Sequence, residues 1–503
     1  MDQFHNREHR LIGNISKNLQ KNICYVEEVM ADCNDLVKKK FKIGKKKNLA
    51  MYLVYVDGLV NTELLRESVI KPMVLDPFRD ARQAIDQWVL ENADWKWITT
   101  MEDAMTAVLS GNTVIFLDGM EQALFISSKF FPTRGVQTAD EEVAMVGPKD
   151  SFNESLRTNT ALIRRRIRDT RLKVLQKQVG TRSKTDYALM YIEDLVREDV
   201  LEKIKKQLDG ICVDGMLDSG MLQQFLEKNS KTPFPVYQLT QRPDKTASAL
   251  MEGRIAVVVD NSPMVLLLPV TMNVFFQASD DYYNRWETAT FARVLRYIAA
   301  FLAVGLPGFY VAIASFHPEV LPTSFLLALI SAREGVPFPV VVEVLLMELS
   351  FELLREAGIR LPGQLGGTIG VVGGLIVGQA AVDAHLVSTI VVIVVALTAI
   401  STFSIPNEIF NSAFRLMKFF IILMCAIWGL YGFFLGFLGV FIHLFCLENY
   451  GVPYMYPVTG KKGEKMTGFQ DFLVRAPLRN MKYRPEFTRR GARIRQKEEE
   501  NEK

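Results

Sequence analysis

Apolar stretches of membrane length are confined to one part of this 503-residue chain, residues 294–447. Residues 1–290 instead have the pattern of a water-soluble protein, with charged residues between short apolar runs, and residues 461–503 are again basic and polar. About 20 consecutive apolar residues are enough for a helix to cross the hydrocarbon of a bilayer. The segregation therefore predicts a soluble region followed by a membrane domain. The net charge of +3 says nothing about either region, because it averages over both.

The soluble region contains an internal similarity. The segment "YLVYVDGLVNTELLRESVIK" (52–71) is similar to "YALMYIEDLVREDVLEKIKK" (187–206), and "GNTVIFLDGMEQALFI" (111–126) is similar to "GRIAVVVDNSPMVLLL" (253–268). Each member of a pair has an apolar, β-rich run followed by the same kind of turn or polar helix, and the order is the same in both halves. The repetition predicts two related α/β subdomains, each with a small sheet covered by helices.

The predicted fold class is an α+β membrane protein, with an N-terminal cytosolic α/β region of two related subdomains and then an α-helical multi-pass membrane domain. The predicted domains are a basic flexible N-terminal segment (1–47), α/β subdomain 1 (48–135), a basic helical connector (136–184), α/β subdomain 2 (185–285), the membrane domain (290–450) and a basic cytosolic tail (451–503). Within the first segment, the run "KKKFKIGKKK" (38–47) is interpreted as a solvated tether.

Acidic residues end several of the predicted strands. Asp57, Asp118 and Asp260 could bind a metal ion or a ligand, but aspartate is also a common turn former that bonds to nearby backbone. We interpret them as turn formers.

The connector carries a cluster of arginines on a predicted helix, namely Arg164, Arg165, Arg166, Arg168 and Arg171. Two interpretations stay open. The cluster could bind anionic lipid head groups, or it could be a solvated face that pairs with acidic neighbours in this chain or in a second copy. No aromatic pattern for reading bases accompanies it, so nucleic acid is not expected as a partner.

The membrane domain contains three long apolar stretches, 294–316, 386–406 and 416–447. The last is too long for one upright helix, so it is either strongly tilted or a hairpin around Gly429, Gly432, Gly436 and Gly439. Basic residues precede the first span and fill the tail, which places both termini in the cytoplasm and predicts an even number of crossings, about four to six.

One glycine-rich segment, 365–382, is predicted to be a helix that lines a path. Gly366, Gly370, Gly374 and Gly378 recur every four residues and form a stripe that permits close helix packing. Thr368, Val372, Leu375, Gln379 and Val382 project from the other side. In a ring of subunits they would form polar rings flanking an apolar constriction, which can gate ions by dewetting. The alternative is a buried helix packed on all sides.

Acidic residues within the apolar region are candidates for an ion path, because charges at membrane depth are costly. Glu343 and Glu348 are expected to set cation preference at a pore mouth. On a helix Glu348, Glu352 and Arg355 share one face and Glu343 points elsewhere, so ion pairing is the alternative. No Walker loop, GxSxG, HExxH or metal-finger spacing occurs, so we expect no enzyme, cofactor or metal site.

Four longer motifs make the sequence recognisable. These are "PTRGVQTADEEVAMVGPKDSFNESLRTNTALIRRRI" (132–167), "AREGVPFPVVVEVLLMELSFELLREAGIRLP" (332–362), "GQAAVDAHLVS" (378–388) and "ENYGVPYMYP" (448–457). They resemble the GerA-type spore germination receptor A subunits, over about residues 48–480. The resemblance implies a multi-pass protein of the inner membrane of the bacterial spore.

The resemblance also implies a function. The family's A subunits are understood to oligomerise, as pentamers by analogy, into a nutrient-gated channel for monovalent cations. They act with a transporter-like B subunit and a lipoprotein C subunit. The alternatives are a related germination channel that amplifies ion release without sensing nutrients, a secondary transporter, and a non-conducting membrane scaffold.

Overall fold

A computed structural model of the chain describes residues 13–43, 49–71, 94–130, 146–227, 231–360, 374, 376–459, 471–485 and 487–496. The chain divides into two compact units. The sheet unit holds the described residues up to 227, residues 237–270 and those from 481 onward. The helical unit holds residues 231–236 and the described part of 271–480.

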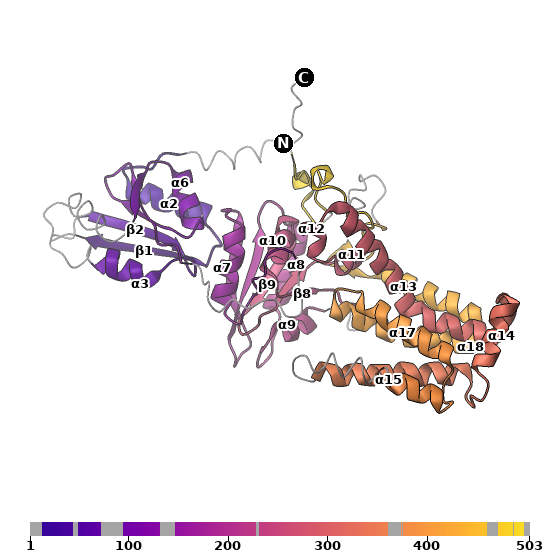
Figure 1. Ribbon diagram of the computed structural model, residues 1–503. Coiled ribbons are helices and arrows are strands. Elements are labelled where there is room, and N and C mark those ends of the chain that lie inside the picture. Colours follow the sequence, from indigo (N-terminus) through magenta and orange to yellow (C-terminus); the bar gives the residue numbers. More distant parts are fainter. Residues whose placement is uncertain are drawn as a thin grey trace, which may run out of the picture. The chain divides into compact units, whose positions relative to one another are not determined.

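The sheet unit begins with a five-stranded antiparallel sheet. Its strands are β1 (Leu36–Ile43), β2 (Leu49–Val56), β3 (Trp95–Ile98), β4 (Thr113–Leu117) and β5 (Ala123–Ile126), in the order β1-β2-β4-β5-β3. Helices α2 (Leu19–Val29) and α6 (Met101–Leu109) pack on one face, and α3 (Thr62–Leu64) with the π-helical turn Leu65–Ile70 on the other (Figure 1). Strand β2 is apolar throughout because its alternate residues enter two different cores.

A second sheet repeats this arrangement. Its strands are β6 (Leu172–Val179), β7 (Thr185–Ile192), β8 (Gln238–Thr240), β9 (Ile255–Val259) and β10 (Val265–Leu268), in the order β6-β7-β9-β10-β8. The helices of this half are α7 (Leu156–Arg166), α8 (Glu198–Asp209), α9 (Ser219–Leu226) and α10 (Pro243–Met251). Strand for strand, the second sheet has the order and the antiparallel pairing of the first.

The strand-ending aspartates have the same structural role in both halves. Asp118 Oδ1 accepts the backbone N–H of Leu19 at the start of α2, at 3.2 Å. Asp260 Oδ1 accepts the N–H of Leu156 at the start of α7, at 3.0 Å. A carboxylate at a helix N-terminus satisfies an otherwise unpaired donor. All three aspartates lie in turns, as predicted; Asp118 and Asp260 also bond to the first residue of a helix, while Asp57 pairs with Arg157.

The two outer strands β1 and β6 lie where the sequence analysis expected a tether and a connector. The lysine-rich run 38–43 belongs to β1, which pairs only with β2 and so forms a sheet edge. Its Val37 and Phe41 pack against the second core of the sheet. Lysines are common on edge strands because they discourage pairing with other chains. A basic run therefore did not exclude a strand.

The last described residues of the chain also belong to the sheet unit. Thr488 Oγ1 donates to the carbonyl of Glu252 at 2.7 Å, and Arg489 N–H donates to the carbonyl of Leu195 at 2.8 Å. Gly253 has φ +81°, and a Cβ there would lie 2.9 Å from the Cα of Thr488. The missing side chain of Gly253 thus makes room for the tail.

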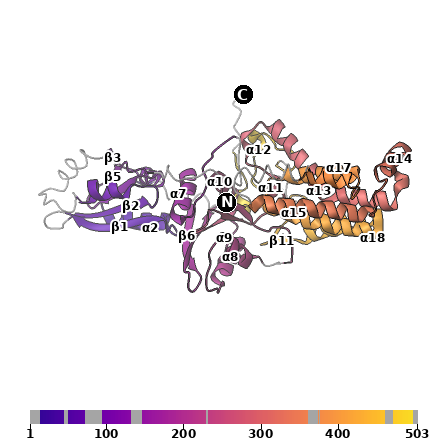
Figure 2. The same ribbon diagram turned by 60° about the horizontal axis from the view of Figure 1, so that its bottom comes forward.

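The helical unit consists of helices that run alongside one another, with α14 at one end (Figures 1 and 2). Its elements are α11 (Met272–Phe276), α12 (Asp280–Tyr283), α13 (Trp286–Phe316), α14 (Thr323–Ala332), α15 (Val340–Arg360), α17 (Thr389–Phe403), α18 (Glu408–Cys446) and the strand pair β11 (Glu448–Asn449) and β12 (Val452–Pro453). Residues 376–383 are also helical, and short 3₁₀ turns lie at Pro318–Val320, Leu478–Asn480 and, in the sheet unit, Arg490–Ala492. By length and composition alone, α13 and α18 could cross a membrane, and α14 and α17 are shorter apolar helices.

The element α18 is a hairpin of two helices, which resolves the choice between tilt and hairpin. Gly429 has φ 59° and ψ −135°, outside the helical region. A Cβ on Gly436 would lie 2.7 Å from Ile421 Cδ1. In a straight helix these residues would be roughly 22 Å apart along the axis, at 1.5 Å per residue. Legs 408–428 and 430–446 therefore lie side by side.

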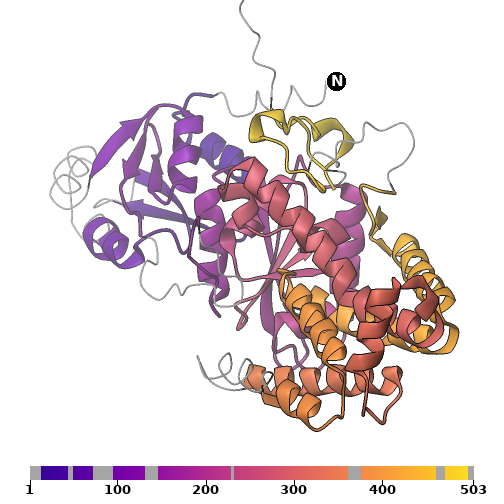
Figure 3. The ribbon, with the colours of Figure 1, turned by 45° about the vertical axis from the view of Figure 1, so that its right-hand side comes forward.

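Helix α13 packs against both legs of this hairpin. A Cβ on Gly305 would lie 3.0 Å from Phe437 Cζ in the second leg. One on Gly308 would lie 2.8 Å from Ile421 Cγ2 in the first leg. Small residues allow helices to approach to this distance in an apolar setting. Residues of α13, α15, α17 and both legs of α18 share one apolar core, and Figure 3 shows these helices, coloured from salmon to yellow-orange, gathered in one bundle.

Replacing Gly429 by alanine is expected to destabilise the helical unit by about 1–3 kcal/mol, the cost of a non-glycine residue in a sparsely allowed conformation. The added Cβ would also lie 3.0 Å from Phe316 Cβ. Thermal unfolding of the full chain in detergent measures the effect. Gly439→Ala is the matched control, since nothing lies within 4 Å of its Cβ position. Equal melting temperatures for the two variants would contradict the hairpin turn.

Candidate functional site

The predicted path-lining face is only partly within the described residues. Thr368, Val372 and Leu375 lie outside them. Gln379 is exposed on the helical segment 376–383, and Val382 is half-buried and packs against the apolar core of the helical unit. The structure therefore places one of these two residues at the surface and directs the other partly inward.

The predicted glycine stripe has two members within the described residues, Gly374 and Gly378, while Gly366 and Gly370 lie outside them. Gly378 is buried, and a Cβ there would lie 3.4 Å from Val392 Cγ1 on α17. A Cβ on Gly374 would meet nothing within 4 Å. Gly378 thus packs against α17, whereas Gln379, about 100° further round the same helix, is exposed.

Glu343 joins three elements at one end of the helical unit. Its side chain is fully buried near the start of α15. Oε1 accepts from Arg333 Nη2 at 3.1 Å, just after α14, and Oε2 accepts the backbone N–H of Ser388 at 2.8 Å, just before α17. The carboxylate is therefore neutralised by an arginine and also bonded to a helix N-terminus, where negative charge is stabilised.

Charged side chains also pair along the contact between α15 and the first leg of α18. We call this set the ion ladder. Its contacts are Lys418 with Glu348 at 2.5 Å and with Glu352 at 3.4 Å, Arg415 with Glu352 at 3.3 Å and with Glu408 at 3.6 Å, and Arg355 with Glu408 at 2.6 Å. Three acids face three bases, so the set is balanced, and the order of the pairs shows that the two helices are antiparallel.

Burial makes the ion ladder energetically important. The side chain of Lys418 is 4% exposed and that of Glu348 is 1% exposed. Taking an ion out of water costs several kcal/mol, which a close partner of opposite charge offsets only while both are present. Within the described part of the chain, Glu348 Oε1 has no hydrogen-bond partner. Loss of either partner would therefore leave the other charge buried and unpaired between α15 and α18, which is strongly destabilising.

The two acids that the sequence suggested for an ion path, Glu343 and Glu348, are thus both paired with basic residues of the same chain. A cation would have to approach each of these buried carboxylates beside the arginine or lysine that already pairs with it.

The basic partners of the ladder were not predicted from the sequence. Arg415 and Lys418 lie three residues apart at the start of a long apolar run, seven and ten residues after Glu408. This spacing places all three on one helix face. A complementary face at 348, 352 and 355 was already evident, so matching the two charge patterns in antiparallel order would have found the contact.

The five arginines of the predicted basic face do not share an exposed surface. Arg164 is fully buried and donates twice to Asp35, at 2.7 and 3.0 Å. Arg166 pairs with Asp150, and Arg171 with Asp169 and Asp194, whereas Arg165 and Arg168 are exposed. Of the two interpretations, pairing within the chain describes three of the five.

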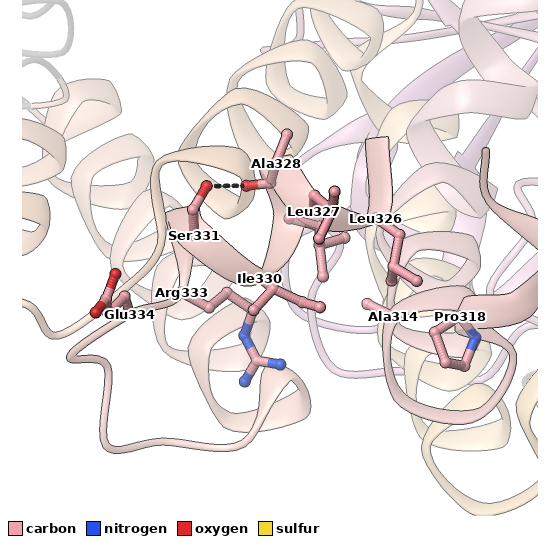
Figure 4. Close-up of a pocket in the computed structure, with 10 residues that line it drawn as sticks. Ala314, Pro318, Leu326, Leu327, Ala328, Ile330, Ser331, Arg333 and Glu334 are labelled. Carbon is pink, nitrogen blue, oxygen red and sulfur yellow. Dashed lines mark hydrogen bonds between the residues drawn. The ribbon is translucent and has the colours of Figure 1, made fainter. Parts of the chain in front are cut away.

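An open groove lies along α14. Leu326, Leu327 and Ile330 of α14 lie beside Ala314 and Pro318 (Figure 4). Arg333 at its edge is already engaged by Glu343, so the groove gains no free cation from it. In the described part of the chain, no group of three His, Cys, Asp or Glu residues is placed to hold a metal ion.

The chain is similar to known proteins over nearly its whole length. The profile of the family described as Bacillus/Clostridium GerA spore germination protein matches residues 24–487. Spore germination protein KA of Bacillus subtilis (strain 168) is 39% identical over 490 residues, which cover 96% of this chain and 89% of that protein. The uncharacterized membrane protein YfkQ of the same organism is 36% identical, covering 95% of this chain and 92% of that protein.

A solved structure is also similar. It is the crystal structure of the N-terminal domain of the A subunit of the Bacillus megaterium spore germinant receptor GerK3. It is 29% identical, with a TM-score of 0.42, and covers 51% of this chain and 97% of that one.

Replacing Lys418 by methionine should destabilise the helical unit by about 3–5 kcal/mol, because Glu348 would be left buried without a partner. Adding Glu348→Gln should recover most of this loss, since the buried charge is then removed as well. Thermal unfolding in detergent measures both. Lys17→Met is the control, because its pair with Glu121 is 70% and 67% exposed and should matter little. A double variant no more stable than Lys418→Met would argue against the pairing.

Proposed function

The chain belongs to the GerA family of spore germination proteins, and on that premise we propose that it is a subunit of a nutrient-responsive spore germination receptor. Several copies, five by analogy with the family, oligomerise into a gated channel that releases monovalent cations at the start of germination. The observation that supports this most directly is the arrangement of the helical unit, in which long apolar helices enclose paired charges that would otherwise be unsustainable in lipid.

The contacts within the helical unit show in which direction each helix runs. These directions allow the membrane crossings to be counted. One end of the helical unit is marked by Arg293 near the start of α13, which pairs with Asp471 of the tail at 2.6 Å, and we call it the tail end. The other, the turn end, is marked by Gly429, whose Cβ position lies 3.0 Å from Phe316. Helix α13 therefore runs from the tail end to the turn end.

The chain then passes back and forth between these ends. Glu343 and Ser388 meet where α15 and α17 both begin, and Arg355 lies over the ring of Phe403 where α17 ends. Because Arg355 also pairs with Glu408 at the start of α18, α15 and α17 both run toward the tail end. The chain between them must return to the turn end, and the two legs of α18 add a pass each way.

This alternation supports six crossings, with both termini on the cytoplasmic side of the inner membrane of the spore. Six is an even number, as the positions of the basic residues require. The membrane protein YfkQ, similar over nearly the whole chain, is named as such. In this arrangement the sheet unit is cytosolic.

We place the ion path along the segment between α15 and α17. In a ring of copies, Thr368, Val372, Leu375 and Gln379 line it, while Gly378 packs the segment against α17. The apolar side chains form the constriction, and the polar ones flank it. Val382 marks the inner end of the lining, where the helix rejoins the core.

The partners that we propose follow the family. A transporter-like B subunit senses the nutrient, a lipoprotein C subunit completes the receptor, and membrane lipids cover the exposed apolar side chains of the helical unit. The relative of known structure is likewise named as the A subunit of a germinant receptor. No enzymatic step is part of the proposal.

Potassium and sodium leakage from growing cells that express the chain, alone or with its partner subunits, tests the path. Leu375→Ala and Val372→Ala are expected to leak, because a smaller side chain widens and wets an apolar constriction. Ile376→Ala is the matched control, since Ile376 is 60% exposed and adjacent in sequence but outside the predicted lining.

The outcomes distinguish the candidate functions, provided that every variant reaches the membrane at the same level. A leak confined to the two lining variants supports the channel. Leakage with the full receptor that does not respond to nutrient supports the amplifying channel. No leak from any variant in intact complexes leaves the scaffold or the transporter.

A further inference from the structure

A short segment of the chain departs from its sequence neighbours. Residues 231–236 pack in the helical unit, although α9 before them and β8 after them both belong to the sheet unit. We call residues 231–236 the insert. Its sequence, KTPFPV, has two prolines around one phenylalanine, which restricts the backbone to extended conformations. An extended, stiff segment is suited to transmitting a displacement.

Phe234 anchors the insert in an aromatic cluster. Its side chain is 2% exposed. The ring centroid lies 6.2 Å from that of Phe410 and 6.3 Å from that of Phe414, both in the first leg of α18, and 6.1 Å from that of His443 in the second leg. One side chain therefore contacts both legs of the hairpin.

Hydrogen bonds hold the insert on either side of this ring. Thr232 Oγ1 lies 2.9 Å from Nε2 of His443 in the second leg. After the ring, the carbonyl of Pro235 accepts the hydroxyl of Tyr454 at 3.0 Å, and that of Val236 accepts the side-chain amide of Asn449. Tyr454 and Asn449 are both buried. Four residues of the insert are thus fixed to the open end of the hairpin and to the segment that follows it.

The connection to the sheet unit is very short. Val236 belongs to the helical unit, and the next residue, Tyr237, belongs to the sheet unit, where its hydroxyl donates to the carbonyl of Leu226 at the end of α9. Strand β8 begins at Gln238, whose side chain accepts from buried Arg254 at 3.0 Å. One residue spans at most about 3.6 Å. A larger movement of the hairpin end must therefore move β8 or break these contacts.

Strand β8 is a suitable receiver because it is an edge strand. Among the described residues it pairs with β10 alone, over three residues. Strand β3 occupies the same place in the first sheet, but no part of the helical unit is continuous with it. The two sheets thus share a fold, and only the second has this connection.

We propose that the insert, with Phe234 as its anchor, couples the opening of the α18 hairpin to the second sheet. Phe234 is a positioning residue: it anchors the insert to both legs of the hairpin, and the chain runs from the insert through Tyr237 directly into β8, so that a displacement of the legs is passed along the backbone to that strand. The gating role rests on the proposed channel function, whereas the coupling itself does not.

Hydrogen exchange of the purified full chain in detergent tests the coupling without any conduction. Phe414→Ala perturbs the first leg of the hairpin next to Phe234. It should speed exchange at β8 (238–240) at least about fivefold, the lower end of typical coupling between sites, and leave β3 (95–98) unchanged. The same substitution in a Phe234→Ala chain should leave β8 at the level of Phe234→Ala alone.

A second variant covers the case in which Phe234→Ala does not fold. Insertion of two glycines between Val236 and Tyr237 keeps every anchor but adds slack to the connection. It should abolish the response of β8 to Phe414→Ala, and the same insertion after Gly119, a turn with nothing within 4 Å of its Cβ position, should not. If β8 responds equally with and without the slack, the insert does not couple the units.

Nutrient-triggered ion release in spores tests the gating role. At equal receptor levels, the two-glycine variant should need at least about tenfold more nutrient for a half-maximal response, whereas Phe225→Ala, which changes an exposed phenylalanine of α9, should not. A wild-type response from the slack variant would overturn the gating role.

The ion leak through Leu375→Ala distinguishes failure of the proposed gating role from failure of the proposed channel. Combined with the two-glycine insertion, it should leak as the single variant does, because the constriction itself is unchanged. If Leu375→Ala never leaks, the proposed channel fails, and the exchange result still decides the coupling.

Discussion

Charges placed among apolar helices need partners of opposite sign, and this requirement fixes the helical unit. Glu348 and Lys418 are the most deeply buried pair of the ion ladder, and the order of the ladder's pairs follows the antiparallel arrangement of α15 and the first leg of α18. Glu343 of α15 likewise bonds to residues next to α14 and α17. Because an unpaired partner would pay the full cost of leaving water, these helices can rearrange only if the pairs move together or exchange partners.

The sequence predicted the parts of the fold that depend on local pattern. Two similar strand and helix series gave the two α/β halves, and the long apolar runs gave α13, α17 and α18. Strands β1 and β6 were not predicted, because edge strands tolerate lysines and polar residues and so have the composition of a solvated segment. Whether 416–447 tilts or folds back depends on contacts between residues such as Ile421 and Gly436, which no local pattern contains.

For the candidate site, the sequence identified the buried charged residues but not the residues that pair with them. The acids at 343 and 348 were singled out because charge in an apolar helix is costly, and both are buried. Their partners lie 10 and 70 residues away in sequence, on other elements. The arginine cluster shows the same limit, since Arg164 finds Asp35 at a separation of 129 residues. A charge pattern identifies residues that need a partner, but only tertiary contacts identify the partner.

The tail carries a consequence for biosynthesis. Thr488 and Arg489 complete the sheet unit by packing over Gly253 and bonding to Leu195, yet the ribosome makes them only after the whole helical unit. This surface of the sheet unit therefore stays uncovered while the helical unit is synthesised. A polypeptide truncated during translation would lack this last contact, so the seating of the tail could report that the chain behind it has been completed.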